Sequence, residues 1–340
     1  SDAPGAASAD RGAPPRLPAS GTDANRTDVV RGAAIGRAPT RHAPSAPAYN
    51  SMQPPSARTT GSARRAVRPI AMPRRPPLLL VTPYAADADG YLQAGLAARD
   101  ALKHEPKLAF SLAPHAPYTV GDATFERIVM YARQLDLPIQ THIAETAHEV
   151  EESCARHGQS PLARLHRLGA TGASFIAIHG VHFDADDIDL LATHGGHVVH
   201  CPASNMKLAS GVAPVAALLA RGIDVALGTD GAASNNRLDV FGEMRLATLL
   251  AKVTTGDPAA LPAFDILRCA TLGGARALGQ EARLGSLVPG KEADVIAVDL
   301  GQLDALPCYD PVSHLVHVVG REAVTDVWVG GERIVADRTL

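Results

Sequence analysis

The stretch LPIQTHIAETAHE, residues 137–149, joins a short apolar run to a polar segment with helical spacing. A short apolar run bounded by turn signals is typical of a buried strand, and the polar segment after it is typical of a solvated helix. At the junction, His142 and Glu145 place imidazole beside carboxylate. That pairing supplies a metal site or a proton relay. It is equally typical of an ordinary helix start, so these two residues alone do not predict a functional site.

The same order of apolar run and helical segment recurs along the chain. Further runs are LLLVTP (78–83), LAFSLAPH (108–115), SFIAIH (174–179), HVVHCP (197–202) and IDVALGTD (223–230). Nearly continuous apolar strands separated by helices predict a parallel sheet that is covered on both faces. The series of such units favours an α/β fold of the (β/α) TIM-barrel type over a doubly wound sheet.

Polar side chains gather where the predicted strands end. They are His115, His142, His179, the segment 201–204 and Asp230. The carboxyl ends of all strands in a barrel point to one face, where the loops build the active site. A single histidine in such a place is commonly structural, but several at successive strand ends predict a site.

Two flanking regions differ from this pattern. After residue 284, RLGSLVPGKEADVIAVDL and VTDVWVGGERIV predict short strands joined by turns, one of them a Gly-Gly hairpin. Residues 1–77 hold 13 of the 26 prolines and carry 12 Arg against 4 Asp, which predicts a disordered segment. A transit peptide and a non-native translated sequence are the alternatives. The predicted domains are therefore 1–77, 78–284 and 285–340.

Composition narrows the function classes. The net charge is −3 and aromatic residues make up 4% of the chain, which argues against nucleic acid as a partner. The four cysteines form no CxxC pair, which argues against a disulfide framework and a structural zinc knuckle. The sequence also has no apolar run long enough to span a membrane. A cytoplasmic protein without a membrane partner is the prediction.

Six motifs, in order, resemble those of the amidohydrolase superfamily. They are HAPYT (115–119), THIAET (141–146), AIHG (177–180), HCPASNMKLASG (200–211), GTDGAASNN (228–236) and GSLVPGKEADVIAVD (285–299). They are most similar to the branch of methylthioadenosine/S-adenosylhomocysteine deaminases and triazine hydrolases. The resemblance implies a metal-dependent hydrolase that cleaves a C–N or C–Cl bond of a small nitrogen heteroaromatic ring. It is compatible with a homo-oligomer.

The resemblance also implies a fold and a cofactor. The fold is a TIM barrel with a small appended β-sandwich, of which the C-terminal part is present here. The cofactor is one divalent metal ion, zinc, with iron as the alternative. His142 would be a metal ligand, and Asp230 would be both a ligand and a base. A zinc-bound water has a pKa of about 7, which explains how such a site makes hydroxide at neutral pH.

The resemblance assigns the remaining roles around the substrate. Glu145 would contact the ring and carry a proton to its nitrogen, because attack on an aromatic carbon requires the ring to accept a proton. His179 would position the attacking water. His115 and Ser234 would contact the substrate. Catalytic residues are thus predicted at Glu145, His179 and Asp230.

One part of the family's pattern is missing. The first barrel strand should end in an HxH pair that supplies two metal ligands, and no HxH occurs in the 340 residues. With GTDG counted as the eighth strand, LLLVTP is the third. We therefore expect a barrel that lacks its first two βα units. A catalytically inactive barrel fragment is the main alternative, and a tethered interaction protein that uses the basic N-terminal segment is a weaker one.

Other polar residues have simpler interpretations. Solvated helix charge is predicted for His148, Glu149, Glu151 and Glu152. Surface or core filling is predicted for His182, His194 and His197. His200 either lines the pocket or is structural. Cys201 has no base near it in sequence and is predicted to be buried and inert.

Overall fold

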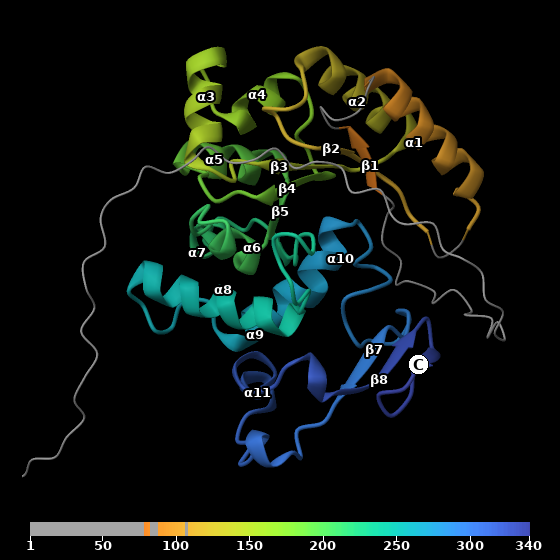
Figure 1. Cartoon of the computed structure of the whole chain (residues 1–340), viewed down its shortest axis with the longest axis vertical. Coiled ribbons are helices and arrows are strands. Elements are labelled where there is room, and N and C mark those ends of the chain that lie inside the picture. Colours follow the sequence, from red (N-terminus) through yellow and green to blue (C-terminus); the bar gives the residue numbers. More distant parts are fainter. Residues whose placement is uncertain (1–77, 82–87, 106–107) are drawn as a thin grey trace, which may run out of the picture. The chain divides into compact units, whose positions relative to one another are not determined.

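The computed structural model describes residues 78–81, 88–105 and 108–340, which all belong to the unit Arg65–Leu340. The predicted disorder of residues 1–77 therefore lies outside the described residues. Strands alternate with helices through the first part of the unit (Figure 1). The elements are β1 (Leu78–Val81), α1 (Ala88–Leu102), β2 (Ser111–Pro114), α2 (Asp122–Leu135), β3 (Ile139–Ile143), α3 (Ala147–His157), α4 (Pro161–Arg167), β4 (Phe175–His179), α5 (Ala185–His194), β5 (His197–His200), α6 (Pro202–Lys207), α7 (Val215–Ala220) and β6 (Val225–Leu227).

Strands β1 to β6 form one six-stranded sheet in sequence order, and every neighbouring pair is parallel. All six predicted apolar runs contribute a strand, although residues 82–83 lie outside the described residues. Several strands are shorter than predicted. The run 223–230 pairs only over Val225–Leu227, because the chain then turns and Asp230 adopts a positive φ of 58°.

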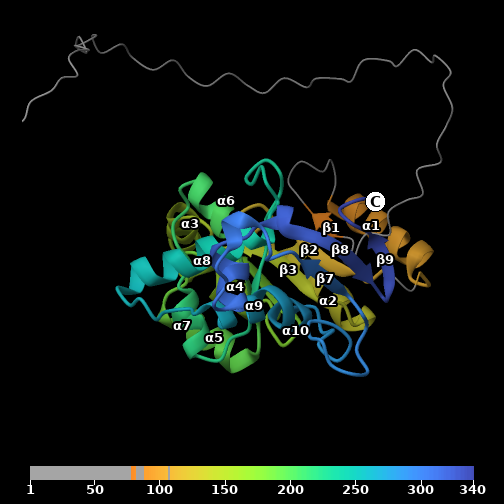
Figure 2. The same cartoon turned by 90° about the horizontal axis from the view of Figure 1, so that it is seen from below.

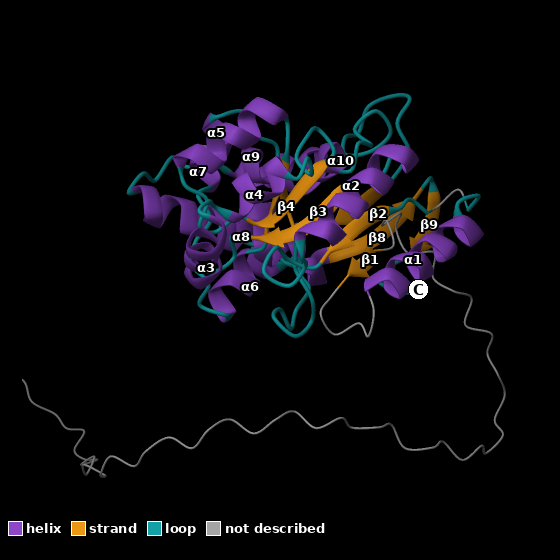
Figure 3. Cartoon of the chain, turned by 90° about the horizontal axis from the view of Figure 1, so that it is seen from above, coloured by secondary structure: helices purple, strands orange, loops and turns teal. Residues whose placement is uncertain are grey.

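Helices cover the sheet because their apolar residues recur at helical spacing (Figure 3). On α2, Phe125, Ile128 and Val129 are buried. On α4, Leu165 is fully buried, and Phe175 of β4 belongs to the same core cluster. Burying one such side chain contributes about 1.5–3 kcal/mol. This packing fixes the strands whose ends carry the site.

Beyond β6 the chain forms a helical region and a second sheet. The elements are α8 (Val240–Thr255), α9 (Ala263–Arg268), the π-helix η1 (Cys269–Gly273), α10 (Gly274–Ala277), β7 (Val295–Val298), the 3₁₀ helix η2 (Leu303–Ala305), α11 (Pro311–His317), the 3₁₀ helix η3 (Arg321–Ala323), β8 (Val324–Val329) and β9 (Glu332–Val335). Strands β7, β8 and β9 form an antiparallel sheet, in which β8 and β9 lie side by side (Figure 2). Gly330 and Gly331, both with positive φ, make the predicted hairpin turn.

Side-chain contacts join the C-terminal helix α11 to the first sheet's helices. Arg245 of α8 donates hydrogen bonds to the carbonyl oxygens of Val316 and Val319, at 3.3 and 3.0 Å. Val316 is fully buried in the main core cluster.

Among the helices of the described residues, none is both long and apolar enough to cross a membrane.

Candidate active site

The predicted histidines lie together at the carboxyl ends of the strands. His142 lies in β3, His179 is the last residue of β4, and His115 follows β2. The ring centroids of His115 and His142 are 5.1 Å apart. Those of His142 and His179 are 5.4 Å apart, with the rings stacked. Parallel pairing brings these strand ends together, so the imidazoles form one continuous row.

The predicted acidic residues and serine join this row. Glu145 Oε2 lies 3.6 Å from His179 Nε2. Ser234 Oγ donates a hydrogen bond to Asp230 Oδ2 at 2.6 Å. The Asp230 carboxylate is close enough to His179 to affect its pKa. All six residues predicted for the site therefore lie in one cluster.

The backbone is strained at three points of the cluster. Ala144, His179 and Asp230 have φ values of 48°, 77° and 58°. A non-glycine residue in this region costs about 1–3 kcal/mol, and such residues gather at functional sites. These backbone conformations set the directions of the side chains at the ends of β3, β4 and β6.

Hydrogen bonds fix the protons of two imidazoles. His142 Nδ1 lies 2.7 Å from the carbonyl oxygen of His115, which can only accept, so this nitrogen carries the proton. His115 Nδ1 lies 2.9 Å from Thr119 Oγ1, whose own proton is directed to the carbonyl of Ala116. Both Nε2 atoms are therefore left with a lone pair. A carbonyl behind the ring is the usual support of a metal-binding imidazole.

His179 has the opposite tautomer. Asn205 Nδ2 lies 3.0 Å from His179 Nδ1, and with the amide in this orientation it donates to Nδ1 and leaves the ring proton on Nε2, facing Glu145. Burial and the neighbouring His142 lower the pKa of His179, against the opposing effect of Glu145. His179 is thus a neutral hydrogen-bond donor toward the centre of the cluster.

Asp230 is an ionised acceptor. Its Oδ2 accepts from Ser204 Oγ at 2.7 Å and from Ser234 Oγ, while Oδ1 accepts from the Gly231 amide at 2.7 Å. Burial acts to raise the pKa of Asp230, but these hydrogen bonds outweigh it and hold the pKa below the usual value. The carboxylate is therefore available as a base or as an anionic ligand.

The site contains residue types that bind zinc, but the described residues supply too few of them to complete a zinc site. His142 Nε2 and the Asp230 carboxylate are typical zinc ligands. In the tautomer described above, His179 Nε2 carries the proton and offers no lone pair to a metal. Within the described part of the chain, no group of three or more His, Cys, Asp or Glu residues is arranged to hold a metal ion. A catalytic zinc normally has three protein ligands, so these residues do not complete its site.

Several residues that support the site were not predicted individually. Ser204 and Asn205 lie on α6 and hold Asp230 and His179. Ser210 Oγ donates to Glu145 Oε1 at 3.2 Å. Each belongs to the HCPASNMKLASG motif, which was the available signal. That motif begins at the last residue of β5 and makes these contacts with the cluster.

The buried carboxylate of Glu243 supports the same region. It accepts hydrogen bonds from the Ala203 amide and from Asn235 Nδ2, at 3.0 and 2.6 Å. It thereby ties α6 to the loop that carries Ser234. Burial raises the pKa of Glu243. Its position inside the helical pattern of α8 gave no sequence signal.

The prediction for Glu149 was wrong. This residue is 4% exposed, because its carboxylate folds back onto the start of α3 and accepts from the Glu145 amide at 2.9 Å. Its helix neighbours His148 and Glu151 are exposed, as expected, whereas Glu152 is half-buried. A capping carboxylate and a solvated one look alike in the sequence.

Burial of Glu149 should make stability depend on pH. Burial raises the pKa of Glu149 from 4.5 to about 7, although backbone N–H groups oppose the rise. Its contribution to the unfolding free energy is full below pH 4.5 and is lost as the pH rises toward 7. The free energy of unfolding should therefore fall by about 2–3 kcal/mol over this pH range because of Glu149, and we expect Glu149→Gln to abolish that part of the fall. Urea unfolding of both proteins between pH 4.5 and 8 measures it; parallel curves would contradict it.

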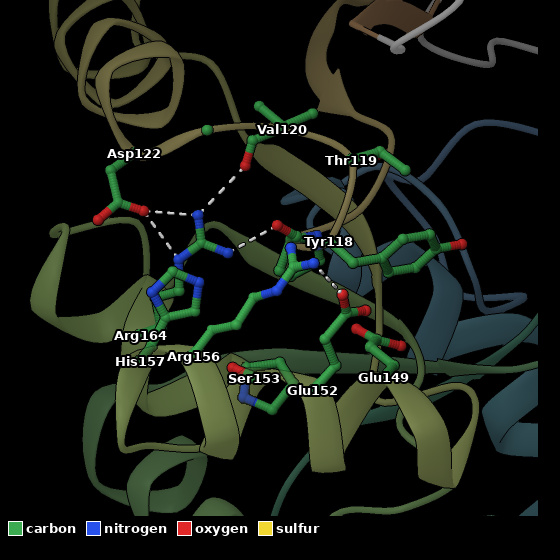
Figure 4. Close-up of a pocket in the computed structure, with 13 residues that line it drawn as sticks. Tyr118, Thr119, Val120, Asp122, Glu149, Glu152, Ser153, Arg156, His157 and Arg164 are labelled. Atoms are coloured by element: carbon green, nitrogen blue, oxygen red, sulfur yellow. Dashed lines mark hydrogen bonds and ion pairs between the residues drawn. The ribbon is translucent and has the colours of Figure 1, made fainter.

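A buried arginine shapes the loop after β2. Arg164 of α4 is 4% exposed and donates to Asp122 and to the carbonyl oxygens of Pro117 and Val120. It forms part of the wall of a pocket of about 360 Å³, together with Glu149 and the loop 117–122 (Figure 4). Arg164 thus holds the loop that follows His115.

The remaining predicted residues divide as follows. His194 is exposed and His182 and His197 are half-buried. His200 is buried, and burial followed by the nearby His179 lowers its pKa to about 4, so it is neutral beside the cluster. Cys201 is buried and its pKa is raised by burial. Its burial was predicted, and the raised pKa disfavours the reactive thiolate.

Comparison with known proteins decides the family. The sequence profile described as the amidohydrolase family matches residues 79–334. The chain belongs to the amidohydrolase family. This family member is 48% identical over 259 residues to the 5-methylthioadenosine/S-adenosylhomocysteine deaminase of Teredinibacter turnerae. It is 43% identical to the 5'-deoxyadenosine deaminase of Methanothermobacter thermautotrophicus.

Solved structures agree with this amidohydrolase assignment. A zinc-bound adenosine deaminase from Xanthomonas campestris superposes with a TM-score of 0.77 and 45% identity, over 78% of this chain and 62% of that one. A zinc complex of atrazine chlorohydrolase from Arthrobacter aurescens gives 0.69 and 28%, over 74% of this chain and 56% of that one. The two curated deaminases are covered over 59% and 55% of their lengths, by 76% and 69% of this chain. This amidohydrolase chain thus spans little more than half of its curated relatives.

Proposed function

We propose that the chain carries the greater part of the active site of a hydrolytic deaminase for adenosine-type nucleosides, with a 5'-thioether adenosine as the preferred substrate. The cluster of His115, His142, Glu145, His179 and Asp230 is the observation that carries this proposal. Relatives at 43–48% identity that are named as deaminases of such nucleosides support the substrate class.

The residues of the cluster match the proton transfers of this reaction. A water molecule must lose a proton to attack the ring carbon, and the ring nitrogen must gain one. Asp230, an ionised acceptor, takes the proton of the water. Glu145 delivers a proton to the ring nitrogen. His179 Nε2–H donates a hydrogen bond to the attacking oxygen. Asp230 then passes the proton that it took from the water to the amino group, which leaves as ammonia, and the new hydroxyl group returns a proton to Glu145 as the carbonyl forms.

Substrate contacts complete the proposal for the cluster. His115 Nε2 keeps a lone pair and accepts a hydrogen bond from the substrate. Ser234 lies in the loop after β6 and contacts the substrate from the side of Asp230. The loop 117–122, held by Arg164, forms the adjoining wall.

We propose that a divalent metal ion, zinc with iron as the alternative, needs donors beyond these residues. His142 and Asp230 would supply two ligands, and an HxH pair outside the present sequence would supply two more. Residues 78–284 would then form the later part of a TIM barrel, and residues 285–340 part of a β-sandwich.

The test uses an extended chain, defined as residues 78–340 preceded by two βα units that carry an HxH pair. We expect it to release ammonia from 5'-methylthioadenosine and no chloride from atrazine. Chloride release without ammonia would instead show a triazine hydrolase. The chain without the added units should show neither activity, as an inactive fragment would, since the described residues do not complete a metal site.

A further inference from the structure

We propose that Glu149 is a positioning residue that holds the backbone of Glu145 in its working conformation. The inference rests on the function proposed above for Glu145, and it assigns a role to a residue that the mechanism does not otherwise use.

Two hydrogen bonds lock the start of α3. Thr146 Oγ1 accepts from the Glu149 amide at 3.2 Å, and Glu149 Oε2 accepts from the Glu145 amide at 2.9 Å. A common capping box would direct the second bond to the amide of the N-cap residue, here Thr146. In this protein the bond reaches one residue further back, to Glu145 itself. Glu145 directly follows Ala144, which has a positive φ of 48°. A hydrogen bond to the Glu145 amide therefore supports a strained stretch of backbone.

The burial of Glu149 is more than capping requires. The side chain lies at the wall of the pocket formed with Tyr118 and Glu152 (Figure 4). Its Oε1 is buried and forms no hydrogen bond of standard geometry among residues 88–105 and 108–340, although the backbone of Ala144 and of Thr146 lies near enough to the carboxyl group to lower its pKa. Burying a carboxylate with an unpartnered oxygen costs stability. A solvated cap would hold the helix at lower cost, and the buried carboxylate accepts from the Glu145 amide, so the cost points to a role in placing Glu145.

The position of the Glu145 carboxylate depends on these two hydrogen bonds at the start of α3. It lies between Ser210 Oγ, which donates to Oε1 at 3.2 Å, and His179 Nε2, which is 3.6 Å from Oε2. Relaxation of the strained turn at Ala144 would rotate the Glu145 backbone and move the carboxylate away from both. A displacement of about 1 Å can reduce a catalytic rate about 100-fold.

The first measurement needs no activity. We would follow hydrogen exchange of the Glu145 amide by NMR in the chain as it exists. Glu149→Ala removes the acceptor, and Glu149→Asp withdraws it by one methylene, so exchange should accelerate at least about tenfold in both. Glu149→Gln keeps an acceptor and should stay close to wild type. The control Glu152→Gln alters another carboxylate of the same pocket and should change nothing.

The second measurement separates positioning from general support of the fold. In the extended chain, 5'-methylthioinosine should bind through its ring N–H to Glu145. Glu149→Ala, or Glu149→Asp if the alanine variant fails to fold, should weaken this binding about tenfold, and the loss should vanish in a Glu145→Gln background.

Unchanged amide exchange in Glu149→Asp would overturn the inference, as would an equal loss of affinity in the Glu145→Gln background. If the wild-type extended chain neither binds the inosine nor turns over substrate, the proposed function fails. The amide exchange then still decides whether Glu149 holds Glu145.

Discussion

Glu145→Gln should lower kcat of the extended chain on 5'-methylthioadenosine by about 10²–10⁴-fold. Glutamine fills the same space and can still accept from Ser210 Oγ, which holds Glu145 Oε1 at 3.2 Å. It cannot carry a proton to the ring nitrogen. Ammonia release under saturating substrate measures the loss, and the zinc content should stay unchanged because Glu145 is not proposed as a ligand.

His148→Gln is the matched control for this variant. His148 lies three residues further along, is exposed, and belongs to the same helix start. The turnover of the His148→Gln variant should equal that of the wild-type extended chain. If Glu145→Gln lost its zinc along with its activity, Glu145 would be a ligand rather than a proton carrier, and the role proposed for it would be wrong.

Arg164→Met should lower the free energy of unfolding by about 3 kcal/mol. The guanidinium is buried, and methionine would leave the Asp122 carboxylate and the carbonyl oxygens of Pro117 and Val120 without its hydrogen bonds. Urea unfolding at pH 7 measures the change. Because the loop 117–122 depends on these bonds, the affinity for substrate should fall as well.

Arg167→Met provides the comparison. Arg167 pairs with the same carboxylate at 2.9 Å, but its side chain is 51% exposed. Solvent screens such a pair, so the loss should be below about 1 kcal/mol. Equal losses in the two variants would mean that burial of Arg164 does not contribute to the loop's stability.

The row of histidines could be predicted because strand ends are visible in the sequence. His142 and His179 each end an apolar run, and parallel pairing brings such ends together. The run 223–230 showed where Asp230 lies. It did not show that pairing stops at Leu227, because the turn after β6 depends on hydrogen bonds from Ser204 and Ser234.

The supports of the site could not be predicted in the same way. Arg164 contacts Asp122 across 42 residues, a separation that no local pattern records. Glu149 lies on a polar helix face, and only the fold determines that it turns inward. The tautomer of His179 depends on Asn205, whose side chain comes from a different strand–helix unit.

Zinc retention tests most directly whether the chain supplies only two ligands, His142 and Asp230. The chain as it exists and the extended chain would be loaded with zinc, dialysed against a weak chelator and analysed for metal. We expect the extended chain to keep about one zinc ion and the present chain to keep almost none, because a catalytic zinc needs about three protein ligands. About one retained ion in the present chain, lost on His142→Ala, would show a complete metal site within it and contradict the proposal.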